Sequence, residues 1–372
     1  MTQTDRSTNR MPQTTDESAT LPLGRSTTIG TLEPSAALET GQRSAPAARD
    51  EILEHVACAV CDSRDYDVVL EACYENERDL DLIQKFRASG DELLIDRLVK
   101  CRACGLQYIS PRLRSDLILA SYAEGEDPVY VSQMPARERT FARALERIER
   151  LSGGPGRLLD IGTAAGGFLA AAKKRGWQAE GCEPNRWLAE WGTRQYGVRI
   201  RPGSVFEQDY EAGQFDVITL WDVIEHTTSP RDTIEHCRTL LKPRGLLVVN
   251  YPDIGSWIAR SLGRRWLFLT SVHLHYFDRN TIARLLESAG FEIEAIRPHV
   301  QRLELDYVLL RSSIVSGGLA HAARRVTSLF GLGRKQVPYW LGQTFVAARR
   351  LPGLLLTMAA SIAELTEVLV VL

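Results

Sequence analysis

The stretch that decides the fold reads LLDIGTAAGGFL (Leu158–Leu169). Its apolar start predicts a buried strand ending at Asp160, and the glycines after it predict a tight turn into a helix. Gly162 and Gly166 would let the backbone approach a ligand closely. The turn lacks the GxGxxG spacing of a dinucleotide site, because Ala164 stands at the position of the second glycine. An acid beside such a turn disfavours pyrophosphate and favours a cationic or zwitterionic ligand.

The chain around this stretch alternates between strand and helix patterns, which predicts an α/β fold with a doubly wound, mostly parallel sheet. Strands are expected at Arg157–Ile161, Gln178–Glu183, Arg199–Pro202, Phe215–Trp221, Gly245–Tyr251 and Phe291–Arg297. Helices are expected at Gly167–Arg175, Arg186–Tyr196, Ser229–Leu241 and Arg279–Ala289.

A second acid, Glu183, ends the second expected strand in AEGCEP. An acid at this place can accept hydrogen bonds from both ribose hydroxyls of a nucleoside. Asp160 and Glu183 together therefore suit S-adenosylmethionine, a nucleoside with an amino-acid tail and a positive sulfur. The alternative is a structural glycine turn with a surface glutamate.

The motifs from 157 to 297 resemble those of class I S-adenosylmethionine-dependent methyltransferases. They read LLDIGTAAGGFL, EGCEP, FDVITLWDVIEHTTSP, LKPRGLLVVNYP and HLHYFDRNTIARLLESAGFEI, in the family's order. The resemblance implies a seven-stranded Rossmann-like sheet. It also implies a cofactor site with a methionine end, a ribose contact, an adenine turn and a wall after the fourth strand, formed by Asp160, Gly162, Thr163, Gly166, Glu183, Ser204, Val205, Trp221 and Asp222.

Two further stretches narrow the resemblance. CAVC followed by VKCRACGLQYISPRL resembles a bacterial subfamily with a zinc-ribbon-like module before the methyltransferase core. GRRWLFLTSVHLHYF (Gly263–Phe277) resembles enzymes of surface-polysaccharide and sugar-modifying systems. The resemblance implies a sugar or glycan precursor as the acceptor.

Methylation of a hydroxyl requires a base, and histidine is the natural one near neutral pH. His226 follows the fourth expected strand, whereas His273 and His275 precede the last helix. We expect His226 or His275 to be the base, with His273 a weaker candidate and Glu225 orienting a histidine or acting alone. Each histidine has a structural alternative as a packed core residue. In a further alternative, Asp222-x-x-Glu225-His226 resembles the stretch of ubiquinone-type O-methyltransferases in which a divalent ion could activate a phenol.

Two CxxC pairs, Cys58/Cys61 and Cys101/Cys104, match a closed four-cysteine site for structural zinc. The alternative is four separate buried thiols or a redox pair. The pairs are 39 residues apart, so we expect a ribbon with an inserted helix or hairpin.

Composition divides the chain into five regions. We expect a disordered tail at 1–50, the zinc-ribbon-like module at 51–112, a helical linker at 113–156, the methyltransferase core at 157–300 and a basic, apolar extension at 301–372. A net charge of -2 and a pI near 6.4 argue against nucleic acid as a partner. The N-terminus has no apolar run, which predicts a cytoplasmic protein.

The extension has no acid between 307 and 350 but carries several arginines. Leu319, Val326 and Phe330 recur there at helical spacing. Such a segment suits peripheral contact with an anionic membrane, and the alternative is a helix packed on the core.

The sequence therefore predicts a methyltransferase that uses S-adenosylmethionine, holds structural zinc and methylates an oxygen of a sugar or glycan precursor. One alternative is an O-methyltransferase for a quinone or another small metabolite. Another is a non-catalytic module that binds S-adenosylmethionine.

Overall fold

The computed structural model describes residues 52–73, 93–306, 308–309, 323, 325–327, 332, 335–340 and 342–352. They all belong to the compact unit Ala47–Leu372. The expected disordered tail, residues 74–92 of the expected insertion between the cysteine pairs, and Leu319 and Phe330 of the helical pattern lie outside these residues. In the part of the chain that is described, no helix is long and apolar enough to span a bilayer.

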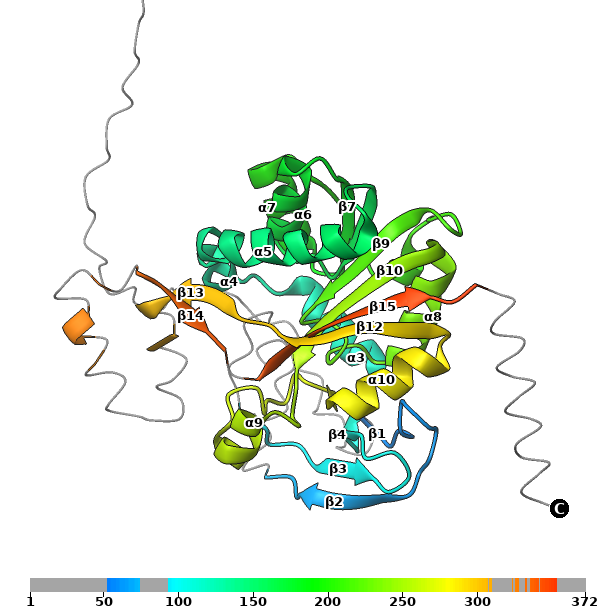
Figure 1. Cartoon of the computed structure of the whole chain (residues 1–372). Coiled ribbons are helices and arrows are strands. Elements are labelled where there is room, and N and C mark those ends of the chain that lie inside the picture. Colours follow the sequence, from blue (N-terminus) through cyan, green and yellow to red (C-terminus); the bar gives the residue numbers. More distant parts are fainter. Residues whose placement is uncertain are drawn as a thin grey trace, which may run out of the picture. The chain divides into compact units, whose positions relative to one another are not determined.

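A seven-stranded sheet forms the centre of the fold (Figure 1). Its strands are β6 (Arg157–Ile161), β7 (Gln178–Glu183), β8 (Arg199–Pro202), β9 (Phe215–Trp221), β10 (Leu241–Pro252), β12 (Phe291–Pro298) and β15 (Gln343–Arg350). Their order across the sheet is β12-β15-β10-β9-β6-β7-β8. Neighbours from β10 to β8 are parallel, whereas β15 is antiparallel to both β10 and β12. The predicted doubly wound, mostly parallel fold is confirmed.

Helices cover both faces of the sheet (Figure 1). One face carries α5 (Met134–Ser152), α6 (Gly167–Lys174) and α7 (Arg186–Tyr196), and the other carries α8 (Pro230–Leu240) and α10 (Arg279–Ser288). Side chains alternate across a strand, so Leu158 and Val217 pack with the first group of helices, and Leu159 and Ile218 pack with the second. Both faces are apolar, as a sheet buried on two sides requires.

The core extends beyond the boundaries 157–300 that the sequence suggests. β15 comes from the expected C-terminal extension and fills the space between β10 and β12. Its last residues, Arg349 and Arg350, bond to Glu294 and to the carbonyl oxygen of Leu241. At the other boundary, the expected linker contains α5, which buries Leu145 in the core.

A second sheet, with the order β11-β4-β3-β2, contains the cysteine region. Its strands are β2 (Tyr66–Leu70), β3 (Leu98–Cys101), β4 (Gln107–Ile109) and β11 (His275–Tyr276), and β1 (Leu53–Glu54) pairs with β5 (Arg112–Leu113) beside it. β11 belongs to the chain between β10 and α10, so the module shares a strand with the methyltransferase core. Arg231 on α8 reinforces this junction by donating to the carbonyl oxygen of Val60 at 2.6 Å.

The remaining elements are short. They are α3 (Ser115–Glu124), α4 (Pro128–Ser132), α9 (Trp257–Leu262), the 3-10 turns η2 (Val205–Glu207) and η3 (Gly263–Arg265), and the hairpin β13 (Gln301–Glu304) with β14 (Gln336–Tyr339).

Gly166 begins α6 with a φ of +71°, and an added Cβ would lie 2.8 Å from Cδ1 of Ile200. Gly197 has a φ of +59° with no atom near its Cβ position. We expect Gly166→Ala to destabilise the fold by about 1–3 kcal/mol more than Gly197→Ala, because only the first adds a collision to the backbone strain. Chemical denaturation of both variants measures the difference. Equal losses would contradict the packing described for this turn.

Candidate functional site

A pocket of about 350 Å³ opens at the carboxyl ends of β6, β9 and β10. α3, α4 and α5 contribute Tyr122, Tyr130 and Arg137 to its wall, and the connection from β10 to β11 contributes Phe268 and Val272. This is the edge at which the sequence predicts a ligand site.

Asp160 reaches the pocket from the end of β6 and is 1% exposed. It accepts a hydrogen bond from Thr219 Oγ1 at 2.5 Å. Burial raises the pKa of Asp160 to about 7, although its hydrogen bonds favour the ionised form. Gly162 and Thr163 also line the pocket, so the glycine turn lies where it was expected.

Glu183 ends β7 but is 0% exposed and is not part of the described pocket wall. Its two carboxylate oxygens accept from the backbone N–H groups of Ala164 and Asn185, both at 2.8 Å. Burial raises the pKa of Glu183 to about 7. The carboxylate thus holds the glycine turn in place. The Tyr122 side chain lies against Glu183 and lines the pocket.

The turn after β8 supplies the part of the wall expected near adenine. Ser204 and Val205 line the pocket, but the Ser204 hydroxyl is bonded to Glu207 Oε2 at 2.7 Å in a capping box. Phe206 also lines the pocket and is exposed. Its ring offers a flat apolar surface, a feature that the sequence analysis missed.

Trp221 ends β9, Asp222 follows it, and both line the pocket as expected. Asp222 has a φ of +53° and accepts from Asn250 Nδ2 at 2.6 Å and from Gln301 Nε2 at 3.2 Å. Burial raises the pKa of Asp222 to about 6. Gln301 comes from the expected extension, so the motifs of the sequence analysis could not indicate this contact.

Glu225, His226 and His273 form a cluster in the pocket wall, with one ligand atom of each within 4.8 Å of the others. Each histidine uses Nδ1 on a backbone oxygen, that of Val272 at 2.9 Å for His226 and that of Phe268 at 2.7 Å for His273. Nδ1 of each ring is therefore occupied, which leaves Nε2 as the nitrogen available to a ligand.

Glu225 adds a carboxyl group to this cluster. It is 2% exposed, and neither of its oxygens has a hydrogen-bond partner. Burial, and secondarily the charge of Asp222, raises the pKa of Glu225 well above its usual value. Burial lowers the pKa of His226 to about 4 and that of His273 further below its usual value, so both imidazoles are neutral at pH 7. Their Nε2 lone pairs and the Glu225 oxygens can receive a proton or bind a cation.

The structure corrects the expectation for His275. This side chain is buried outside the described pocket wall, stacked on Phe277 with ring centroids 6.0 Å apart. Its backbone pairs with Tyr108 in the module sheet. His273 lies in the turn before β11, where its N–H donates to the carbonyl oxygen of Thr270 at 3.1 Å, and it lines the pocket. His275 lies in the strand itself, and its side chain is packed in the interior.

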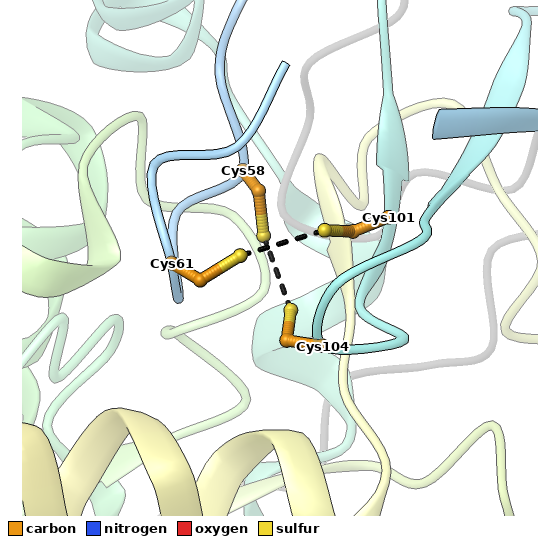
Figure 2. Close-up of side chains that lie close together, drawn as sticks. All are labelled: Cys58, Cys61, Cys101 and Cys104. Atoms are coloured by element: carbon orange, nitrogen blue, oxygen red, sulfur yellow. Dashed lines mark hydrogen bonds between the residues drawn. The ribbon is translucent and has the colours of Figure 1, made fainter. Parts of the chain in front are cut away.

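The four cysteines of the two CxxC pairs converge as expected, and Figure 2 shows their sulfur atoms pointing toward one centre. The Sγ atoms of Cys58 and Cys104 are 3.3 Å apart, and those of Cys61 and Cys101 are 3.5 Å apart. A zinc ion with Zn–S bonds of about 2.3 Å needs sulfur separations of about 3.8 Å in a tetrahedron. The group therefore fits a tetrahedral S₄ zinc site. Cys73, Cys182 and Cys237 lie outside it.

Comparison with known proteins identifies residues 133–296 as matching a family described as a methyltransferase domain. Among curated proteins, the ubiquinone biosynthesis O-methyltransferase of Bordetella avium is 25% identical over 172 residues, which cover 41% of this chain and 70% of that one. Its counterpart in Roseobacter denitrificans is 39% identical over 98 residues, or 25% of this chain and 39% of that one. A probable S-adenosylmethionine-dependent methyltransferase of Mycolicibacterium smegmatis is 32% identical over 107 residues, or 29% and 40% of the two chains.

Solved structures similar to this chain include the YcgJ protein from Bacillus subtilis, with a TM-score of 0.42 and 15% identity. That similarity covers 57% of this chain and 99% of the other. Residues 133–296 span α5 and six of the seven strands of the central sheet, from β6 to most of β12, and leave out β15. The protein is an S-adenosylmethionine-dependent methyltransferase with the class I fold.

Proposed function

We propose that this enzyme O-methylates a sugar or glycan precursor and that the cluster of Glu225, His226 and His273 receives the proton of the acceptor hydroxyl. One observation carries the proposal. Three proton acceptors converge in the same pocket as the Asp160 turn, and both oxygens of Glu225 lack a partner.

The cofactor end of the pocket would hold S-adenosylmethionine, which supplies an electrophilic methyl group on a positive sulfur. The Asp160 carboxylate suits the ammonium group of its methionine part. Gly162 has no side chain, so that part of the ligand could approach the turn closely. Glu183 would take the ribose once the Tyr122 side chain moves away from it. Phe206 offers an apolar face to the adenine.

At the acceptor end, the substrate hydroxyl would donate to the Nε2 atom of His226 or His273. As the oxygen forms its bond to the methyl carbon and the carbon–sulfur bond breaks, the proton passes to that nitrogen. A base with a pKa near 4 holds a proton weakly. When Glu225 is ionised, its raised pKa makes it the more stable final site for the proton, and this gives the pair a relay role.

The polar part of the pocket wall favours a sugar as the acceptor. Arg137, Thr140, Asn250, Gln301 and Gln343 all line it. Such side chains can bond to several hydroxyl groups at once, and a sugar presents such a set.

A second candidate is an O-methyltransferase for a quinone-type phenol, assisted by a divalent ion. Two observations favour it: the names of the relatives above and the ability of Glu225, His226 and His273 to ligate a metal. Asp222 is the weaker third ligand, because Asn250 and Gln301 already use its oxygens. His273, although distant in sequence, is a better third ligand than Asp222 because it lies in the cluster with Glu225 and His226.

We further propose that the four-cysteine group holds a structural zinc ion. Four thiolates would complete the coordination of zinc and leave no position for a substrate. The ion would then stabilise the module sheet, whose strand β11 follows His273 directly.

Asp160→Asn should weaken S-adenosylmethionine binding by about 10- to 100-fold, because a charge-assisted contact is lost. In the wild type, affinity should fall about 10-fold from pH 7.0 to pH 5.5, since the carboxyls of Asp160 and Glu183, with pKa values of about 7, become protonated. Calorimetry at both pH values measures the two effects. The exposed Asp209→Asn serves as the control. Unchanged affinity in Asp160→Asn would place the cofactor elsewhere.

The function is tested by transfer of labelled methyl groups into fractionated host extract. We expect label in nucleotide sugars or polymer. We also expect His226→Ala to lower kcat by about 10²- to 10⁴-fold, since it removes a general base, without changing cofactor affinity. His275→Asn, which alters a histidine outside the pocket, should retain activity. Label confined to a small apolar product, lost on chelation and restored by a divalent ion, would support the quinone-type candidate instead.

The zinc proposal predicts about one zinc ion per purified chain by elemental analysis. Cys101→Ser should lose that ion and lower the melting temperature, because one of four ligands is gone. Cys73→Ser should keep both, as Cys73 is outside the group. A chain that is free of zinc yet melts normally would contradict the proposal.

A further inference from the structure

The connection between β10 and β11 carries an exposed surface that the methyl-transfer site does not use. We define this α9 surface by Trp257, Arg260 and Leu262 on α9 and by Arg264 and Arg265 on η3. Trp257 is 63% exposed, more than any other large apolar residue in the described chain, and Leu262 is 36% exposed. Leaving such side chains in water costs free energy, which calls for a partner.

The charge of this surface has a single sign. Arg260, Arg264 and Arg265 are exposed, and the sequence has no Asp or Glu from 254 to 277. None of the three arginines forms an ion pair with another residue in the described ranges. Elsewhere on the protein, exposed arginines such as Arg102 and Arg114 are paired with acids. The α9 surface is therefore basic as well as apolar.

Buried neighbours fix the α9 surface in place. The Ser256 hydroxyl caps α9 by accepting from the N–H of Ala259 at 3.2 Å. Ala259 and Trp266 on either side are buried in one apolar cluster with Leu98. The Trp257 ring leans on that of Trp340, with centroids 6.0 Å apart. The exposed side chains thus project from a well-packed segment, so binding would cost little conformational entropy of the backbone.

We propose that the α9 surface binds an anionic lipid bilayer, with Trp257 and Leu262 in the interface and the three arginines on the lipid phosphates. Tryptophan beside arginine is the composition that membrane interfaces favour, and a charge of one sign complements anionic lipid. A membrane contact is expected from the sequence at 307–350, and the α9 surface lies outside that segment. Trp340, against which Trp257 packs, belongs to it.

The α9 surface lies on the same connection as part of the pocket wall, so membrane binding there would also position the pocket. The same connection continues through Phe268, Val272 and His273, which line the pocket. Binding at α9 would hold the acceptor side of the pocket near the bilayer, where acceptors attached to lipid are found. The membrane contact itself does not depend on which acceptor is methylated.

The test is sedimentation of the full-length protein with lipid vesicles. We expect binding to vesicles of phosphatidylcholine mixed with phosphatidylglycerol, little binding to phosphatidylcholine alone, and release by salt. The double variant Arg264→Glu/Arg265→Glu should lose at least about 10-fold in partitioning, since each arginine contributes to the attraction. The matched control is Arg139→Glu/Arg143→Glu on α5, which changes the same charge at two exposed positions and should bind like wild type.

A second measurement identifies the surface in contact. Brominated lipids quench tryptophan that reaches the acyl region, so part of the wild-type fluorescence should be quenched. Trp257→Phe should lose most of that quenching while still binding. Vesicle binding that is equal in both double variants, or that ignores lipid charge, would overturn the proposal. So would the absence of vesicle binding combined with self-association that Trp257→Ala abolishes, which would assign the surface to a second copy of the chain. None of these readouts requires methyl transfer, so their failure is distinct from failure of the proposed function.

Discussion

Four carboxyl groups buried around one pocket set the central constraint on this protein. Asp160, Glu183, Asp222 and Glu225 each follow or end a strand of the sheet, and burial raises the pKa of each one. Keeping such groups ionised in a poorly solvated site costs free energy unless positive charge or hydrogen bonds compensate. A ligand with a sulfonium and an ammonium group provides that charge. In the proposed function, the cofactor would meet this electrostatic demand.

The four acids meet this demand in different ways. Backbone N–H groups satisfy Glu183, a threonine hydroxyl satisfies part of Asp160, and two amide side chains hold Asp222. Glu225 alone among them has no partner for either oxygen. A residue left unsatisfied in this way is costly to keep, which directs attention to Glu225 as the place where a proton or cation is received.

The cysteine module acts on the pocket through the backbone. The N–H groups of Leu274 and His275 both donate to the carbonyl oxygen of Glu225, and the N–H of Ile109 in the module donates to the carbonyl oxygen of Leu274. The position of His273 therefore depends on the module sheet as well as on the methyltransferase core. If the four cysteines hold zinc as proposed, this arrangement is how the ion would influence a pocket that lies outside the module.

The sequence by itself determined the elements whose periodicity is local. β6, β7, β8, β9 and α7 begin and end at the residues expected from their apolar patterns and caps, and the two CxxC pairs announced the four-cysteine group. Only the tertiary structure decided what depends on distant segments. The short pattern of β15 gains its place from pairing on both sides with β10 and β12. The turn before β11 leaves His273 in the pocket wall, whereas His275 in β11 is buried outside that wall. Contacts of Asp222 with Gln301 and of Glu183 with Tyr122 join segments that are far apart in sequence. Local propensity carries no information about such contacts, because they form only when the whole sheet has closed.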